Sequence, residues 1–122
     1  RNSWQQIYWR LQKNERRWKK TTEIIDTSVA IEKEVGATTI FTVVEYPKCL
    51  DYVTEIFYPD DKDFETAIEL SRGLTQIGKQ IGAIDILIAS ICINRDLKLI
   101  TKDNHFGHIK EVDKRFQLKI VK

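Results

Sequence analysis

The amino-acid sequence predicts a single α/β domain built on a mostly parallel sheet. Its 122 residues are the length of one domain. Short apolar runs rich in β-branched residues alternate with stretches of helical periodicity, and this alternation is typical of strand–helix–strand units. Hydrophobic residues make up 42% of the chain and charged residues 31%, as in soluble globular proteins.

The composition excludes several classes of protein. No apolar run approaches the roughly 18–20 residues that cross a bilayer, so we expect no membrane association. The first 20 residues are too polar and too charged for a signal peptide. Cys49 and Cys92 cannot form a disulfide framework, and neither lies in a CxxC pair or near a histidine. We therefore expect reduced thiols, no zinc site and a cytoplasmic protein.

The net charge of +2 conceals two different parts of the chain. Residues 1–20 carry a net charge of +6, whereas the other 102 residues carry −4. All three tryptophans also lie within residues 1–20. Aromatic and apolar residues recur there at helical spacing with cations between them, which predicts a basic N-terminal helix over residues 1–21. These aromatic and apolar residues are Trp4, Ile7, Tyr8, Leu11 and Trp18.

This basic segment has two interpretations. Aromatic side chains stack on bases and cations contact phosphates, so the segment can bind nucleic acid. Alternatively, its aromatic stripe docks on the body of the protein or on a second copy, and its cations face water. The sequence does not separate the two.

The body of the chain, residues 22–122, begins with a predicted buried strand at residues 23–26, an apolar run that ends in an acid. Thr27 and Ser28 follow, with hydroxyls suited to capping a helix. That helix is predicted over residues 29–35, because Gly36 is typical of the position just after a helix end.

The next three elements are predicted from β-branched residues and from one proline. Residues 38–42 are β-rich and predict a second strand. Thr42 is suited to cap a helix over residues 43–52, in which Pro47 is tolerated only because it lies near the first turn. Alternating apolar residues predict a third short strand at residues 53–58.

The second half of the body is predicted to add two helices and two strands. A turn at residues 59–61 precedes a helix that begins at Asp63. Apolar residues share one side of this helix: Phe64, Ala67, Ile68 and Leu70. The remaining predicted elements are an apolar helix at 84–93, a buried strand at 97–101, a loop at 102–107 and an edge strand at 116–121.

Four acids lie where open α/β sheets form their sites, outside the carboxyl ends of the strands. Asp26 ends the first strand, and Asp103 follows the strand at 97–101 after one residue. Glu45 and Asp85 lie in the first turns of predicted helices. The acids have apolar flanks and no evident basic partner in sequence, and burying such a group is costly unless it is paired or bound to a metal. We therefore expect a cation site, and oxygen ligands favour Mg²⁺ or Mn²⁺.

Each acid alone also has a purely structural explanation. Helix caps and the helix dipole favour an acid at the positions of Glu45 and Asp85. Asp103 can close a turn with its own backbone. The four together are harder to explain in this way. The acids of residues 60–63 are expected to lie in a solvated turn without function.

The segments that contain these acids resemble, in order, the four motifs of PIN domains. The matching segments are residues 24–28 (IIDTS), 42–46 (TVVEY), 84–90 (IDILIAS) and 99–106 (LITKDNHF). The resemblance covers about residues 22–122, and the VapC-type toxins of toxin–antitoxin pairs are the most similar subgroup. It implies a three-layer α/β/α fold.

The resemblance also implies an endoribonuclease that depends on Mg²⁺ or Mn²⁺, a small antitoxin as partner and a homodimer. It implies that Asp26, Glu45, Asp85 and Asp103 are the catalytic metal ligands. Supporting roles are implied for Thr27, Ser28, Thr101 and Asn104.

Two features depart from the family pattern. Only 18 residues separate Asp26 from Glu45, which is short for the family, so a helix there is expected to be trimmed. Many relatives carry an acid where this chain has His105. The alternative function is a non-catalytic RNA-binding or assembly module that keeps the fold without the metal. An aspartyl-phosphate enzyme is excluded because Ser28 stands where its second acid is needed.

Overall fold

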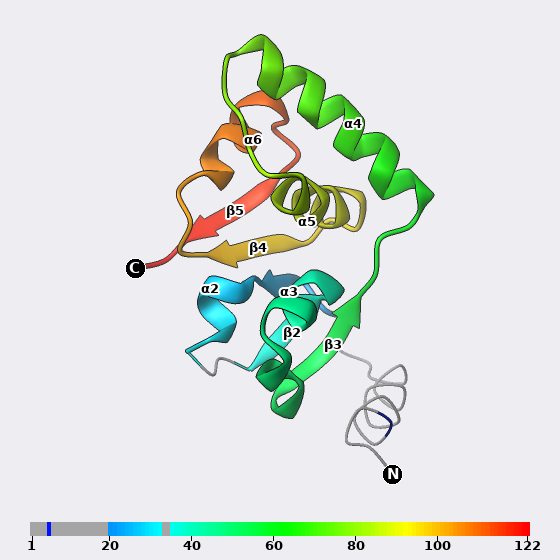
Figure 1. Cartoon of the computed structure of the whole chain (residues 1–122), viewed down its shortest axis with the longest axis vertical. Coiled ribbons are helices and arrows are strands. Elements are labelled where there is room, and N and C mark those ends of the chain that lie inside the picture. Colours follow the sequence, from blue (N-terminus) through cyan, green and yellow to red (C-terminus); the bar gives the residue numbers. More distant parts are fainter. Residues whose placement is uncertain (1–4, 6–19, 33–34) are drawn as a thin grey trace.

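The chain folds around one sheet of five parallel strands, seen in a computed structural model that describes residues 5, 20–32 and 35–122. The strand order is β3-β2-β1-β4-β5, and every neighbouring pair is parallel (Figure 1). This confirms the predicted α/β class. The strands are β1 (Glu23–Ile25), β2 (Gly36–Thr39), β3 (Val53–Phe57), β4 (Lys98–Thr101) and β5 (Gln117–Ile120).

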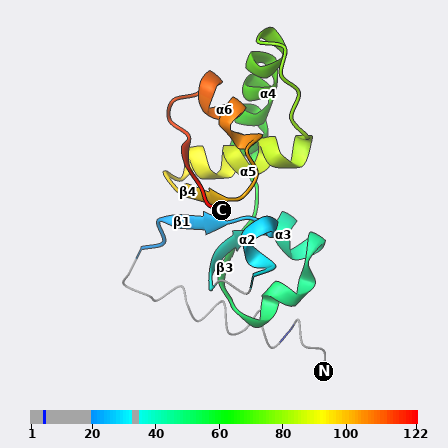
Figure 2. The ribbon, with the colours of Figure 1, turned by 90° about the vertical axis from the view of Figure 1, so that its left-hand side faces the viewer.

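Helices cover both faces of the sheet. The helical elements are α2 (Thr27–Ala30), α3 (Ile40–Glu45), the 3₁₀ helix η2 (Pro47–Asp51), α4 (Asp61–Gln76), α5 (Ala83–Asn94) and α6 (Phe106–Val112). In the side view, α4, α5 and α6 lie together on one side of β1 and β4, and α2 and α3 lie on the other (Figure 2). The predicted three-layer architecture is thus confirmed.

Adjacent residues of β1 feed two separate cores. Side chains of a strand alternate between faces, so Ile24 packs with α4, α5 and α6, whereas Ile25 packs with α2, α3 and η2. The first core is the larger and includes the fully buried rings of Phe106 and Phe116. Both faces of β1 are buried, so Asp26, the polar residue directly after this strand, lies in the interior of the molecule.

The segment between β1 and β3 differs from the sequence prediction. The first helix ends at Ala30, and Gly36 begins β2 instead of following a helix. The second strand stops at Thr39, and α3 occupies Ile40–Glu45. Pro47 explains why α3 ends, because the residue before a proline avoids helical backbone, and Tyr46 has φ −143° and ψ 77°.

The predicted loop after β4 is shorter than expected. Residues Phe106–Val112 form α6, a helix that the sequence pattern did not predict. The helix is short, but Phe106 and Ile109 lie on its inner face and are fully buried. Packing therefore stabilises a helix that local propensity alone would leave marginal. The other predicted elements of the second half, α4, α5, β4 and β5, are present with shifted ends.

Most of the predicted N-terminal basic helix lies outside the described residues. Lys20 is exposed, and the hydroxyl of Thr21 donates a hydrogen bond of 2.5 Å to Glu55 in β3. Among the described residues, no helix is both long enough and apolar enough to span a membrane.

Asp63 contradicts the prediction of a solvated acidic turn, because its side chain is completely buried. Asp60 caps α4, and its carboxylate and that of Asp63 each accept a hydrogen bond from the other's backbone N–H. Asp63 also accepts hydrogen bonds of 2.9 Å from Arg95 and 2.8 Å from Asn94. Burial raises the pKa of Asp63, but the hydrogen bonds from Arg95 and Asn94 outweigh it and hold that pKa below its ordinary value. The start of α4 is thereby fixed to the end of α5.

Replacement of Asp63 by alanine should destabilise the protein by about 2–4 kcal/mol, because Arg95 and Asn94 lose their buried acceptor. The exposed neighbour Asp61 is the matched control, and Asp61→Ala should cost less than about 1 kcal/mol. Urea unfolding measures both. Because the folded-state pKa of Asp63 is lowered, its stabilisation is present at neutral pH and should disappear as the pH falls below 3.8. Equal effects of the two substitutions at pH 7 would contradict this role.

Candidate active site at the carboxyl edge of the sheet

The four acids singled out by the sequence meet at the carboxyl edge of the sheet. Asp26 directly follows β1, and Asp103 lies just beyond β4, which pairs with β1. Asp85 lies in the first turn of α5, as predicted. Glu45 is the last residue of α3, so the prediction that it lies in a first helical turn is wrong. Because α3 has only six residues, Glu45 still lies near the edge of the sheet, where Thr27 bonds to it.

The charges of the other three acids act on Asp85. Burial raises the pKa of Asp85, and the charges of Asp103, Asp26 and Glu45 raise it further. The His105 side chain acts in the opposite direction and more weakly. Among the described residues, no lysine or arginine forms an ion pair with any of these four acids. The edge of the sheet therefore holds negative charge that the described residues do not neutralise.

Asp26 is held by two hydroxyls. The Ser28 hydroxyl donates to Oδ1 at 2.6 Å, and the Thr101 hydroxyl donates to Oδ2 at 2.5 Å. Each hydroxyl also accepts a backbone N–H, that of Lys102 for Ser28 and that of Asp103 for Thr101, both at 3.0 Å. Two parallel relays, from N–H to O–H to carboxylate, thus tie Asp26 to the turn that contains Asp103. Asp26 as a whole residue is only 7% exposed.

Thr27 has a similar task for Glu45. Its hydroxyl donates a hydrogen bond of 2.6 Å to Glu45 Oε1 and lies 3.4 Å from the hydroxyl of Thr42. The predicted role of Thr27 and Ser28 as helix caps is wrong, since Asp26 is the N-cap residue of α2 and both hydroxyls point to carboxylates instead. Instead of capping a helix, Thr27 connects Glu45 to the segment that contains Asp26.

Asp103 closes its own turn, as one of the structural explanations predicted. Its Oδ1 accepts the backbone N–H of His105 at 2.9 Å and lies 3.0 Å from Nδ1 of the same residue. Asn104 is exposed in this turn, and its backbone carbonyl accepts the N–H of Gly107. The second carboxylate oxygen of Asp103 takes no part in the turn and can serve another partner.

Two threonines at the site were not singled out by the sequence as site residues. Thr42 lies beside Thr27, although the sequence suggested only a cap for it. Thr39, at the carboxyl end of β2, has the one buried side-chain oxygen in the described part of the chain without a hydrogen-bond partner. The run of β-branched residues at 38–42 predicted a strand, and the sequence indicated only Thr42, as a cap and as the first residue of the segment 42–46.

The donor set fits a hard divalent cation in its chemistry. The converging groups are carboxylates, which Mg²⁺ and Mn²⁺ prefer. As they stand, no three or more His, Cys, Asp or Glu side chains of the described residues are arranged to hold one ion. Both oxygens of Asp26 retain a lone pair beyond their hydroxyl donors, so the relays leave room for a ligand.

Comparisons with known proteins agree with this fold. A family model of the PIN domain matches residues 40–112. It spans Glu45, Asp85 and Asp103. Comparison with curated proteins finds no match.

Solved structures of VapBC toxin–antitoxin systems have a similar fold. VapBC-5 from Mycobacterium tuberculosis aligns with a TM-score of 0.64 and 23% identity, over 84% of this chain and 99% of that one. VapBC2 from Rickettsia felis, bound to a promoter DNA fragment, aligns with a TM-score of 0.66 and 19% identity, over 82% and 98%. VapBC from Salmonella typhimurium, bound to DNA, aligns with a TM-score of 0.64 and 12% identity, over 83% and 98%.

Asp85→Asn should stabilise the protein at pH 7 in the presence of a chelator. The fold raises the pKa of Asp85 above 3.8, so ionisation costs stability as the pH rises through that region, and asparagine does not ionise. The advantage should disappear below about pH 3.9, where the unfolded chain is also protonated. Urea unfolding across the pH range tests this. A variant that is less stable than the parent at pH 7 would show that the acids do not repel one another.

Thr101→Val should lower stability by about 1–3 kcal/mol, because the isosteric valine leaves Asp26 without one donor and Asp103 N–H without its acceptor. Thr101→Ser keeps the hydroxyl and should recover most of the loss. Thermal unfolding of both variants separates the relay from simple packing. If serine is as destabilising as valine, the relay has no energetic role.

Proposed function

The chain belongs to the PIN-domain family, and on that premise we propose that it is a metal-dependent endoribonuclease, the VapC-type toxin of a toxin–antitoxin pair. The proposal joins the family to the chemistry of one edge of the sheet. A fold does not by itself specify an activity. The function is therefore argued from the residues of the site.

One observation supports the proposal above the others: carboxylates from β1, α3, α5 and the β4–α6 turn share one edge without an ion pair to lysine or arginine among the described residues. Such a cluster repels a phosphodiester as long as it is bare. A divalent cation reverses that repulsion, and a hard cation is the one that carboxylates bind. The arrangement is costly for stability, and no lysine or arginine of the described residues neutralises it, which is typical of a functional site.

The proposed metal ligands and catalytic residues are Asp26, Glu45, Asp85 and Asp103. When bound, Mg²⁺ or Mn²⁺ would supply a more acidic water and stabilise charge on the phosphate. Ser28 and Thr101 orient Asp26, and Thr27 orients Glu45. Asn104 is exposed in the same turn, where a substrate can reach it.

The proposed partners are an RNA substrate, a small antitoxin and a second copy of the chain. The similar structures are of VapBC proteins, one of them described as a toxin–antitoxin system, and this chain covers 98–99% of the chains it aligns with. An antitoxin is therefore the partner that this likeness best supports. We place the activity in the cytoplasm, where its RNA substrates are.

The central experiment measures cleavage of RNA with Mn²⁺ or Mg²⁺. Asp26→Asn and Asp85→Asn should each reduce cleavage by at least about 100-fold, because each removes a charged ligand from the site. Asp61→Asn, an exposed acid of α4, is the matched control and should cleave normally. Chelation of the metal should abolish cleavage by the parent protein. Undiminished cleavage by either site variant would refute the assignment.

Calorimetry with Mn²⁺ distinguishes the metal-dependent nuclease from the alternative, a non-catalytic RNA-binding or assembly module. A nuclease of this kind should bind Mn²⁺, and Asp85→Asn should weaken the binding. A chain that binds no Mn²⁺ at millimolar concentration is instead a non-catalytic module with the same fold.

A further inference from the structure

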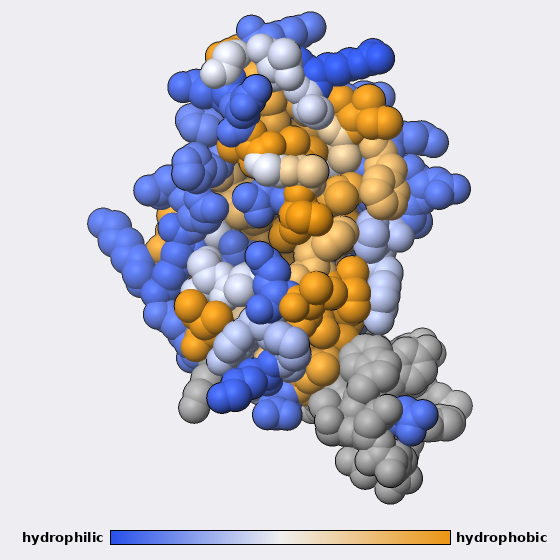
Figure 3. All heavy atoms as spheres, viewed as in Figure 1, coloured by the Kyte–Doolittle hydropathy of each residue, from blue (hydrophilic) through white to orange (hydrophobic). Residues whose placement is uncertain are grey.

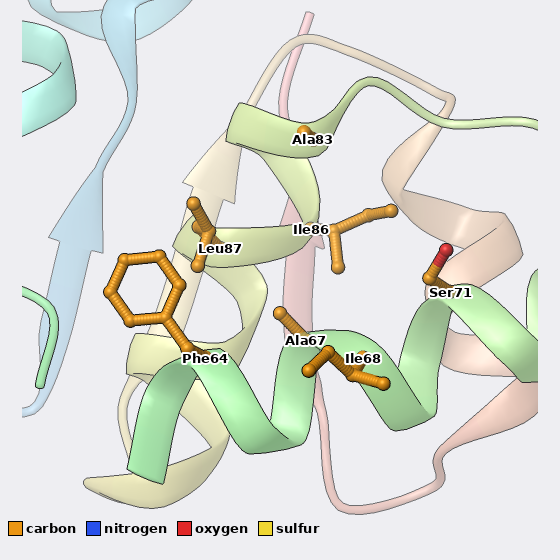
Figure 4. A pocket seen from close by; sticks show the side chains of 7 residues that line it. All are labelled: Phe64, Ala67, Ile68, Ser71, Ala83, Ile86 and Leu87. Atoms are coloured by element: carbon orange, nitrogen blue, oxygen red, sulfur yellow. The ribbon is translucent and has the colours of Figure 1, made fainter. Parts of the chain in front are cut away.

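An apolar pocket of about 300 Å³ opens between α4 and α5. All the residues that line it are apolar except Ser71: Phe64, Ala67, Ile68, Ala83, Ile86 and Leu87 (Figure 4). Phe64 and Ile68 stand at its side with 49% and 58% of their surface exposed. A hollow of this kind beside exposed large apolar side chains is typical of a surface that another segment covers.

The pocket and the carboxylate cluster share the first turn of α5. Ala83, Ile86 and Leu87 line the pocket, while Asp85, between them in sequence, is coupled to the other three acids. Apolar atoms gather over the α4 and α5 side of the molecule in the view of Figure 3 and continue past α3. Val44, next to Glu45 in α3, is 73% exposed. Asp85 lies around the helix from the pocket, so a ligand that covers this end of α5 and reaches from the pocket to the carboxylates would combine apolar side chains with positive charge.

We propose that the N-terminal segment of this same chain, residues 1–19, is that ligand. Residues 1–20 carry +6, and the four site acids have no lysine or arginine ion pair among the described residues, so the segment and that edge of the sheet are complementary in charge. The segment also contains all three tryptophans, spaced among its cations. Its aromatic side chains occupy the pocket and its cations lie beside the carboxylates. This pairing goes beyond the nuclease proposal and does not depend on it.

The segment is long enough to reach the pocket. The described chain enters the fold at the amino edge of the sheet, where Thr21 bonds to Glu55 and β1 begins at Glu23. Strands of three to five residues separate that edge from the carboxylates. Nineteen residues span up to about 60 Å when extended. A domain of about 100 residues has a radius of gyration of only about 13 Å. An attached segment also acts at a high effective concentration.

Tryptophan fluorescence of the 122-residue chain tests the proposal directly. Because every tryptophan lies in residues 1–20, the emission reports on this segment alone. The bound segment should show blue-shifted emission and at least about twofold weaker quenching by acrylamide than in urea-unfolded protein. Ile68→Glu and Phe64→Glu should each remove this protection, since they place a charge at the pocket. Ile77→Glu is the matched control, because Ile77 is 44% exposed at the end of α4 and does not line the pocket.

Three outcomes would overturn the proposal. The first is a folded parent protein whose tryptophans are as accessible as in the unfolded chain. The second is an equal loss of protection in Ile77→Glu. The third is protection that increases with protein concentration, which would assign the surface to a second copy. Protection that weakens as salt screens the charges would support the electrostatic part. None of these readouts needs metal or RNA, so a failure here is distinct from a failure of the nuclease assay.

Discussion

The pairing of β1 with β4 is the constraint on which the site depends. Ile25 lies opposite Ile100, and the N–H of Asp26 bonds to the Ile100 carbonyl. This register places Asp26 beside the Thr101 hydroxyl and beside the turn of Asp103. A slip by one residue would turn each side chain to the other face and separate the first acid from the fourth. The negative cluster exists because the two cores hold this register.

The network around Asp63 supports the same site from the other end of α5. Asp63 and Arg95 join the start of α4 to the end of α5. A helix of 12 residues is about 18 Å long and stiff, so fixing one end also positions the other. Asp85, in its first turn, can therefore be held near three like charges. The stabilising contacts of Asp63 with Arg95 at the end of α5 offset the repulsion between Asp85 and the other acids at its start.

The charge division of the sequence acquires a spatial meaning in the fold. The negative body is not evenly negative, since its four site acids share one edge beside an apolar pocket. Other acids are paired with cations, as in Glu32 with Lys102 and Asp113 with Arg115. The four site acids lack such pairs among the described residues. The edge of the sheet that they occupy is the proposed metal site, and a positively charged partner would compete with the metal ion for it.

The sequence by itself determined the fold class, most strands and the long helices. It also singled out the four acids that lie at the carboxyl edge of the sheet. Those features depend on periodicity and on short local motifs, which a chain displays without folding. Local pattern also misled: the acids around residue 63 look like a solvated turn, and the helix at 106–112 lacks a strong signal of its own. Only the tertiary structure decided that Asp63 is buried and that Thr101, together with Ser28, clamps Asp26. Asp63 depends on Asn94, 31 residues away, and Asp26 on Thr101, 75 residues away, and contacts at such separations are not visible in a local stretch of sequence.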